Sequence, residues 1–105
     1  MNKPLETNEA FFQEDQFKHT KHMYGLKDLK TGQIHGAPFI HYGEGDAIRA
    51  FSDAVNTGQK DSLIAMHPED YELFFLGYFE PSTGVLHENI PQSVITGDKL
   101  VVVAE

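Results

Sequence analysis

The sequence predicts a small α+β fold in which two β-hairpins form an antiparallel sheet packed against one main helix. Two apolar runs with glycine-containing turns, over residues 22–42 and 71–88, indicate the hairpins, and helical spacing over residues 47–55 indicates the helix between them. The chain has 105 residues and 40% hydrophobic residues, enough for one core but not for two. We therefore expect one domain over residues 21–105, preceded by an N-terminal extension over residues 1–20 that is mobile or forms a short helix.

The first hairpin is predicted from an alternating run followed by a turn. Residues 22–28 alternate in a strand-like manner, and the turn over residues 30–33 contains Gly32, which can adopt a positive φ. The chain is then expected to return as a second strand over residues 34–42. Pro38 lies inside this run and has no backbone N–H, so the strand must lie at the edge of the sheet or be broken there.

The main helix is predicted from an apolar face at helical spacing. Residues 43–46 introduce it, and Asp46 is the expected N-cap because its carboxylate can accept the free amides of the first turn. Gly58 is the expected C-terminal stop. The apolar face consists of Ala47, Ile48, Phe51 and Val55.

The second hairpin is predicted to hold the central strand, because residues 71–80 are apolar on both faces. Alternation places Leu73, Phe75 and Phe79 on one face and Phe74, Leu76 and Tyr78 on the other. A loop over residues 80–84 and a return strand over residues 85–88 complete the hairpin. Residues 91–97 are expected to be irregular, and residues 100–104 are expected to form a last short strand.

The composition excludes several classes of protein. The absence of cysteine excludes a disulfide scaffold, thiol catalysis and cysteine-ligated metal sites. No apolar run approaches the ~20 residues that span a bilayer, and the start of the chain lacks the apolar core of a signal peptide, so we expect a cytoplasmic protein without membrane association. The formal net charge of −8 disfavours a general neutraliser of nucleic acids, because phosphate binding relies on Lys and Arg.

The charge is nevertheless uneven, and its one basic stretch is a candidate binding surface. Residues 18–43 hold four lysines against one aspartate, interspersed with aromatic residues that can stack single-stranded bases. The candidate nucleic-acid-binding residues are Lys21, Tyr24, Lys27, Lys30, Phe39 and Tyr42, with Arg49 on the helix as a further candidate. The alternative interpretation places the aromatic residues in the core and uses the lysines as solvated protection of a sheet edge. The overall acidity favours this alternative.

Arg49 is the only arginine of the chain, and it lies on the predicted helix. It can pair with Asp46 or Asp53 on the helix surface, which is the slightly favoured interpretation. It can also contact a phosphate or the carboxylate of a partner.

A third candidate is the turn formed by His67, Pro68, Glu69 and Asp70. His67 could serve as a base oriented by Asp70, but no nucleophile or oxyanion pocket accompanies it, so a structural turn is favoured. His19 and His22 stand three residues apart, yet no acidic residue stands at a matching spacing to complete a metal site. The sequence therefore predicts no enzyme, no metal site and no cofactor.

Three groups of residues resemble a known family. They are Ala47-x-Arg49-x-Phe51-x-Asp53-Ala54-Val55-Asn56, then His67-Pro68-Glu69-Asp70-Tyr71-x-Leu73-Phe74-x-Leu76-Gly77-x-Phe79, and then Thr83-Gly84. In order and spacing they resemble the small nonstructural protein of gokushovirus-type microviruses, which are bacteriophages with circular single-stranded DNA genomes. The resemblance covers residues 23–91 of this chain.

The resemblance implies a nonstructural accessory protein of genome replication in the cytoplasm of the infected bacterial host. It implies binding to single-stranded DNA or to a replication protein of the phage or the host, and a part in the switch to single-stranded DNA synthesis and packaging. It implies no catalytic residues. The alternative is an assembly or interaction protein that forms a homo-oligomer, such as a homodimer joined through an exposed hairpin edge, without nucleic-acid contact.

Overall fold

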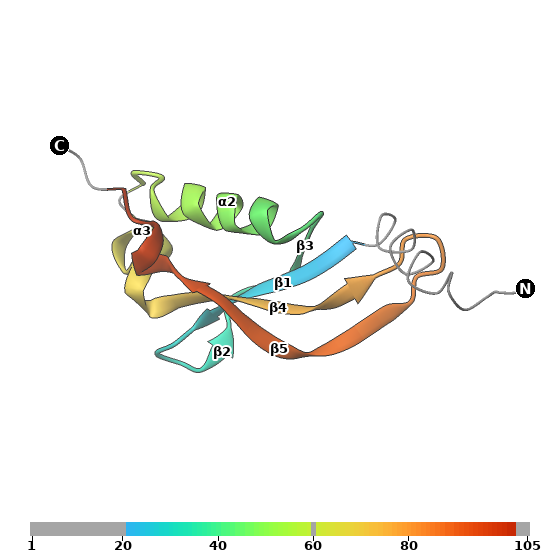
Figure 1. The fold of residues 1–105 in the computed structure, drawn as a ribbon. Coiled ribbons are helices and arrows are strands. Elements are labelled where there is room, and N and C mark those ends of the chain that lie inside the picture. The colour runs from blue at the N-terminus through green and yellow to red at the C-terminus, as the bar shows by residue number, and fades with distance from the viewer. Residues whose placement is uncertain (1–20, 60, 103–105) are drawn as a thin grey trace, which may run out of the picture.

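The computed structural model describes residues 21–59 and 61–102. The predicted N-terminal extension, including His19, lies outside the described residues, as do residue 60 and residues 103–105. In the described part, an antiparallel sheet forms one layer and the main helix lies across one of its faces (Figure 1). The predicted α+β fold is therefore confirmed.

The sheet has the strand order β2-β1-β4-β5, and β3 pairs with β1 beside β2. β1 (Lys21–Asp28) pairs with β4 (Tyr71–Phe79), and β4 pairs on its other side with β5 (Leu86–Thr96). The other side of β1 is shared by β2 (Gln33–Ile34) and β3 (Phe39–His41). Neighbours on both sides of β4 confirm that it is a central strand.

The returning arm of the first hairpin is broken, as the proline predicted. The turn closes with the amide of Gly32 donating to the carbonyl of Asp28 at 2.7 Å, and Gly32 has a φ of 76°. β2 then ends at Ile34 and β3 begins only at Phe39, with Pro38 in the connection between them. Because proline has no N–H to donate to β1, the ladder resumes one residue after it.

Helix α2 (Glu44–Val55) begins earlier than predicted. Its N-cap is Gly43, whose carbonyl accepts the first helical hydrogen bond from the amide of Ala47 at 3.1 Å. The prediction that Asp46 is the N-cap is therefore wrong. Asp46 lies inside the first turn, and its carboxylate contacts Nδ1 of His41 at 3.2 Å. The extended backbone of Gly43 lets the helix start without a side-chain cap.

The core lies between α2 and the face of the sheet beneath it. Three of the four residues of the predicted apolar helix face are buried, and Ile48 packs against them, so this prediction is confirmed. Leu73 and Tyr24 meet the helix from the two neighbouring strands β4 and β1. The buried residues of the core are Tyr24, Leu26, Ala47, Phe51, Val55, Tyr71 and Leu73.

The C-terminal part of the chain differs from the prediction. Residues 91–97 were expected to be irregular, but β5 continues to Thr96. Pro91 is accommodated because β5 is an edge strand and because the register shifts between Phe75 and Gly77 of β4, which leaves Pro91 outside the ladder. The strand expected over residues 100–104 is also wrong for its described part, where the short helix η2 (Gly97–Leu100) is followed by irregular backbone.

The same register shift changes which side chains share a face in β4. Strict alternation would separate Phe75 from Tyr78, but Phe75 pairs with Tyr24 and Tyr78 pairs with His22, two residues earlier in β1. Phe75 and Tyr78 therefore share the helix-covered face. Phe79 was predicted on the same face as Phe75, and this is wrong, because Phe79 lies on the other face. Gly77 makes the shift possible, because its φ of 149° is one that L side chains rarely adopt.

Short helices connect the two hairpins. α3 (Leu63–Met66) begins at Ser62, whose hydroxyl accepts from the amide of Ala65 at 3.2 Å, and η1 (Pro68–Asp70) leads into β4. Over residues 21–59 and 61–102, none of the helices has the length and apolar character needed to cross a bilayer.

Candidate functional site

The two faces of the sheet are unequal. Helix α2 covers one face, whereas among the described residues no helix lies over the other, which we call the open face (Figure 1). Alternation along the strands sends every second side chain of β1 to the open face, opposite to Tyr24 and Leu26. The residues of the open face include Lys21, Met23, Gly25, Lys27, Ile34, Ile40, Tyr42, Glu72, Phe74, Leu76 and Phe79.

Two lysines of the open face lie over aromatic rings. The Nζ atom of Lys21 is 5.6 Å from the ring centroid of Tyr42, and Nζ of Lys27 is 5.4 Å from that of Phe74. Both distances fall within the ~6 Å of a cation–π contact. The two lysines stand six positions apart in β1, which at ~3.3 Å per residue is roughly 20 Å along the sheet. Tyr42 is 77% exposed, so it remains accessible to a ligand.

Each lysine–aromatic pair borders a hollow of the surface. The hollow at Lys21 and Tyr42 measures about 390 Å³ and also reaches Ile40, Phe79, His41 and Asp46. The hollow at Lys27 and Phe74 measures about 210 Å³ and is otherwise lined by Gly32, Ile34, Leu76 and Pro91. The open face thus has a partly apolar hollow next to each of the two lysines, Lys21 and Lys27.

Gly25 brings the backbone of β1 close to this surface. A Cβ atom at this position would lie 3.2 Å from side-chain atoms of both Ile34 and Leu76, which is tighter than ordinary van der Waals contact. The glycine therefore allows these two side chains to close over β1 between the two lysines.

The structure divides the predicted binding residues into two groups. Lys21, Lys27 and Tyr42 lie together on the open face, and Lys30 is exposed in the turn that follows β1. Tyr24 is only 2% exposed and belongs to the core, so it cannot be a stacking platform for an external base. For this residue the alternative interpretation, an aromatic residue in the core, holds.

Phe39 and Arg49 also lie away from the open face. Phe39 is half-buried and packs against the core. Arg49 is exposed on α2, in the layer opposite to the lysines. In the part of the chain that the structure describes, Arg49 forms no ion pair, and its predicted partner Asp46 contacts His41 instead. The predicted pairing of Arg49 with a neighbouring carboxylate is therefore not found.

Acidic residues lie both on α2 and beside the lysines of the open face. Glu44, Asp46 and Asp53 lie on α2, and Asp46 also lines the hollow at Lys21. On the open face, Glu72 stands opposite Lys27 in the register, and its carboxylate accepts a hydrogen bond from the hydroxyl of Ser93. Each lysine of β1 on the open face thus has a carboxylate in its vicinity, Asp46 in the hollow at Lys21 and Glu72 opposite Lys27.

A cluster of aromatic side chains on the helix-covered face was missed by sequence reasoning. The ring of His22 lies 5.1 Å from that of Tyr78 and 5.8 Å from that of Phe75, and Phe75 lies 5.5 Å from Tyr24. With Glu44 at the start of α2, these rings line a pocket of about 240 Å³. The signal that could have revealed it is Gly77, since a glycine inside an apolar strand indicates a bulge that can realign its neighbours.

Burial shapes the ionisation of this cluster. Burial lowers the pKa of His22, which favours the neutral imidazole. Burial also raises the pKa of Tyr24, and the negative charge of Glu44 raises it further. The hydroxyl of Tyr24 lies 3.5 Å from Nδ1 of His22, so two polar groups lie side by side in the lining of the pocket.

The turn at His67, Pro68, Glu69 and Asp70 has a clear structural role. The amide of Asp70 donates to the carbonyl of His67 at 2.9 Å, and the amide of Leu29 donates to the carbonyl of Asp70 at 2.8 Å. The first bond closes the turn, and the second ties the residue after β1 to the residue before β4. The side chains of His67, Glu69 and Asp70 bring potential ligand atoms within 4.8 Å of one another, an arrangement that exposed acidic groups commonly adopt without an ion.

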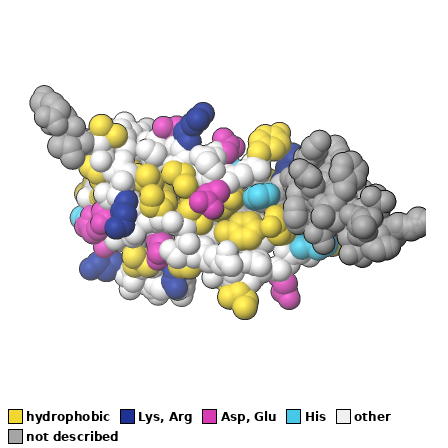
Figure 2. All heavy atoms as spheres, in the orientation of Figure 1, with side chains coloured by type: hydrophobic (Ala, Val, Ile, Leu, Met, Phe, Trp, Pro, Cys, Tyr) yellow, Lys and Arg dark blue, Asp and Glu magenta, His cyan; other side chains and the backbone are white. Residues whose placement is uncertain are grey.

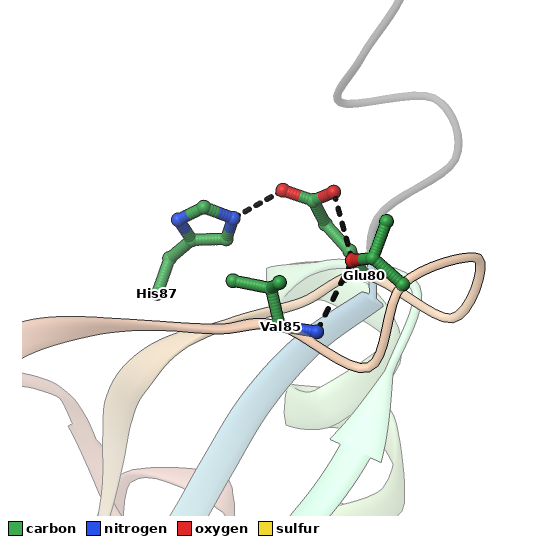
Figure 3. A network of polar contacts seen from close by, with 4 residues as sticks. Glu80, Val85 and His87 are labelled. Carbon is green, nitrogen blue, oxygen red and sulfur yellow. Dashed lines mark hydrogen bonds and ion pairs between the residues drawn. The ribbon is translucent and has the colours of Figure 1, made fainter.

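The tip of the second hairpin is fixed by a polar network (Figure 3). The carboxylate of Glu80 contacts Nε2 of His87 across the hairpin and accepts a hydrogen bond from the hydroxyl of Thr83 at 3.3 Å. The same hydroxyl accepts from the amide of Val85 at 3.2 Å. The network orders the loop, and His87 and Glu80 are engaged in it rather than directed at a ligand.

Comparison with known proteins finds one family. A family model described as Phage ORF5 protein matches residues 21–100, which is more than half of the chain and includes α2 and the strands of the described residues. No curated protein and no solved structure matches the chain.

Proposed function

Because the chain belongs to the Phage ORF5 protein family, we propose that it is a nonstructural accessory protein that binds single-stranded DNA during phage genome replication. The protein would act by binding rather than by catalysis, in the cytoplasm of the infected bacterial host. Its resemblance to the small nonstructural protein of gokushovirus-type microviruses supports a part in the switch to single-stranded DNA synthesis and packaging, because the genomes of these viruses are single-stranded. Family membership supports the phage role, and the open face supports the choice of ligand.

The observation that carries the proposal is the pair of lysine–aromatic contacts on the open face. Proteins that bind single strands without strong sequence preference combine cations that follow the backbone with exposed rings on which bases stack. Lys21 with Tyr42, and Lys27 with Phe74, provide this combination twice along one strand. Stacking on an exposed ring such as Tyr42 contributes ~1–3 kcal/mol per base.

The net charge of −8 limits this binding without preventing it. Surface charges more than ~10 Å apart are largely screened at 0.1 M salt, so a phosphate near Lys21 interacts chiefly with its nearest neighbours. Of the carboxylates on α2, Asp46 lines the hollow at Lys21, whereas Glu44 and Asp53 line neither hollow of the open face. We therefore expect binding that is weak, favoured by low salt and dependent on the open face.

The test is a fluorescence-anisotropy titration of labelled single-stranded DNA at low and at moderate salt. The open-face double variant Lys21→Ala/Lys27→Ala is compared with the control Arg49→Ala/Lys99→Ala, which removes the same charge from the helix side. The open-face variant should weaken binding at least tenfold and reduce the salt slope by about 1.4, at ~0.7 per phosphate contact. Equal losses in both variants would contradict the proposal. Absence of binding at low salt would contradict it too, and would direct the search to a replication protein of the phage or host.

A second candidate function, homo-oligomerisation, rests on the outer edge of β5. No strand among the described residues pairs with this edge, and β5 carries two strongly exposed apolar residues, Leu86 at 63% and Ile90 at 83%. An unpaired edge with apolar side chains can add a strand from a second copy. If this occurs, sedimentation analysis should show a dimer that Ile90→Lys dissociates and that Asn89→Lys disrupts less. A monomer at high concentration would exclude it.

A further inference from the structure

The aromatic pocket on the helix-covered face is separate from the open face. It lies between the start of α2 and strands β1, β4 and β5, and Figure 2 shows hydrophobic, histidine and acidic side chains gathered between α2 and β5. Its volume of about 240 Å³ is below the ~300–1,000 Å³ typical of pockets for drug-sized ligands. The pocket therefore suits a single flat ring system.

Its walls offer ring faces and edges at stacking distance. His22 and Phe75 both meet Tyr78 edge-on, with centroids 5.1 and 5.3 Å away and interplanar angles of 89° and 72°. All three rings line the pocket, so part of each ring is presented to its interior. A flat heteroaromatic ligand can stack on such a face, as nucleobases do on the aromatic residues of single-strand-binding proteins.

The polar groups of the pocket select the orientation and type of ligand. Glu44, at the first position of α2, contributes a carboxylate, which accepts hydrogen bonds and repels a phosphate. Gln92 on β5 contributes an amide that both donates and accepts. Tyr24 is close enough to Glu44 for that carboxylate to raise its pKa. These groups favour a ligand that enters with an N–H edge first and keeps any phosphate outside.

From this arrangement we propose that the pocket binds one nucleobase that carries an exocyclic amino group, with the amino group directed at Glu44. Cytosine, adenine and guanine have such a group, and thymine does not. A carboxylate is the acceptor that pairs with the amino group of cytosine in protein–DNA contacts. The base can come from a free nucleotide or from an unstacked position of a single strand, and the chemistry of recognition is the same.

This inference does not depend on DNA binding by the open face. The two sites lie on opposite faces of the sheet and share none of their lining residues. Loss of strand binding in the Lys21→Ala/Lys27→Ala variant would leave the pocket able to take a nucleoside. The failure of one proposal can therefore be told from the failure of the other.

The test is an NMR titration of the full chain with deoxycytidine and, separately, with thymidine, followed through the aromatic signals of His22 and Tyr78. Deoxycytidine should shift both signals in a saturable manner, and thymidine should bind at least tenfold more weakly. Glu44→Gln should remove most of this preference. Asp53→Asn, which makes the same charge change at the far end of α2, should leave it unchanged.

Several outcomes would overturn the proposal. They are the absence of shifts at His22 and Tyr78 with either nucleoside, an equal response to the two nucleosides, and an equal effect of Glu44→Gln and Asp53→Asn. Because Glu44 is exposed, its replacement should not disturb folding, and circular dichroism of the variant checks this. A second arm uses deoxycytidine monophosphate and a short deoxycytidine oligomer. Tighter binding of the oligomer at the same signals assigns the base to a strand, and equal binding assigns it to a free nucleotide.

Discussion

The two faces of the sheet are built from alternate residues of the same strands, yet they differ in how deeply their side chains are buried. Beneath α2, Leu73 is fully buried and Leu26 is 8% exposed, while on the open face the next residues, Phe74 and Lys27, are only partly buried. One face follows the rules of a core. The other combines apolar side chains with cations, a mixture that a buried core would exclude.

The difference separates the face that stabilises the fold from the face that we propose for binding. The covered face needs α2, because an amphipathic helix and a half-apolar sheet bury each other's apolar surface. The open face keeps apolar surface in contact with water, and a contiguous surface of this kind usually marks an interaction site. Two lysines lie over its rings, and these pairs are the basis of the proposed binding to single-stranded DNA.

The largest effect that would sharpen this comparison is a matched pair of truncations. Leu73→Ala should cost about 3 kcal/mol of unfolding free energy, because it opens a cavity in a fully buried site. Leu76→Ala, on the open face, should cost about 1 kcal/mol, because water already reaches that side chain. Urea denaturation measures both. Equal costs would show that another layer covers the open face.

A second prediction concerns Gly77, where the alternation of the β4 side chains between the two faces of the sheet shifts. Gly77→Ala should cost about 2 kcal/mol, because the new Cβ atom would lie 2.3 Å from the carbonyl oxygen of His87 on a backbone with positive φ. Gly84→Ala is the control: Gly84 also has a positive φ, 79°, but its Cβ would meet nothing within 4 Å, so about 1 kcal/mol is expected. Thermal denaturation distinguishes them, and similar losses would mean that the close approach in β4 contributes nothing.

The smallest effect is a pH dependence of stability that belongs to the covered face. Because burial lowers the pKa of His22 in the folded state, protons bind more readily to the unfolded chain. The unfolding free energy should therefore decrease as the pH falls below about 6.5, and level off once the pH is below the folded pKa. His22→Gln should show a smaller decrease over the same range. Parallel pH profiles of the two proteins would contradict this assignment.

Much of the fold could be predicted from the sequence because it depends on local patterns. The spacing of Ala47, Phe51 and Val55 predicts the buried face of α2, and Pro38 predicts the break in the first hairpin. The path of β5 past Pro91 could not be predicted, because it depends on the register with β4 and on the place of β5 at the sheet edge. The start of α2 was also missed, since Gly43 provides the cap by conformation rather than by side chain.

The candidate site was predictable in part for a related reason. Lys21, Lys27 and Tyr42 share a face because even spacing along β1 and pairing with the end of β3 bring them together. Tyr24 stands at odd spacing from both lysines, so it must point to the opposite face once β1 is a regular strand. The aromatic pocket could not be predicted by alternation, because the shift at Gly77 moves Tyr78 across the sheet.

The measurement that tests the division of the two faces most directly is methyl NMR of the full chain during titration with single-stranded DNA. The methyl signals of Ile34, Ile40 and Leu76 report on the open face, and those of Leu26, Val55 and Leu73 report on the covered face. With a strand that contains only thymidine, whose base lacks the amino group that the aromatic pocket is proposed to bind, we expect DNA to shift the open-face signals and to leave the covered-face signals in place. Shifts confined to the covered face, or no shifts at low salt, would contradict the assignment of the open face as the DNA-binding surface.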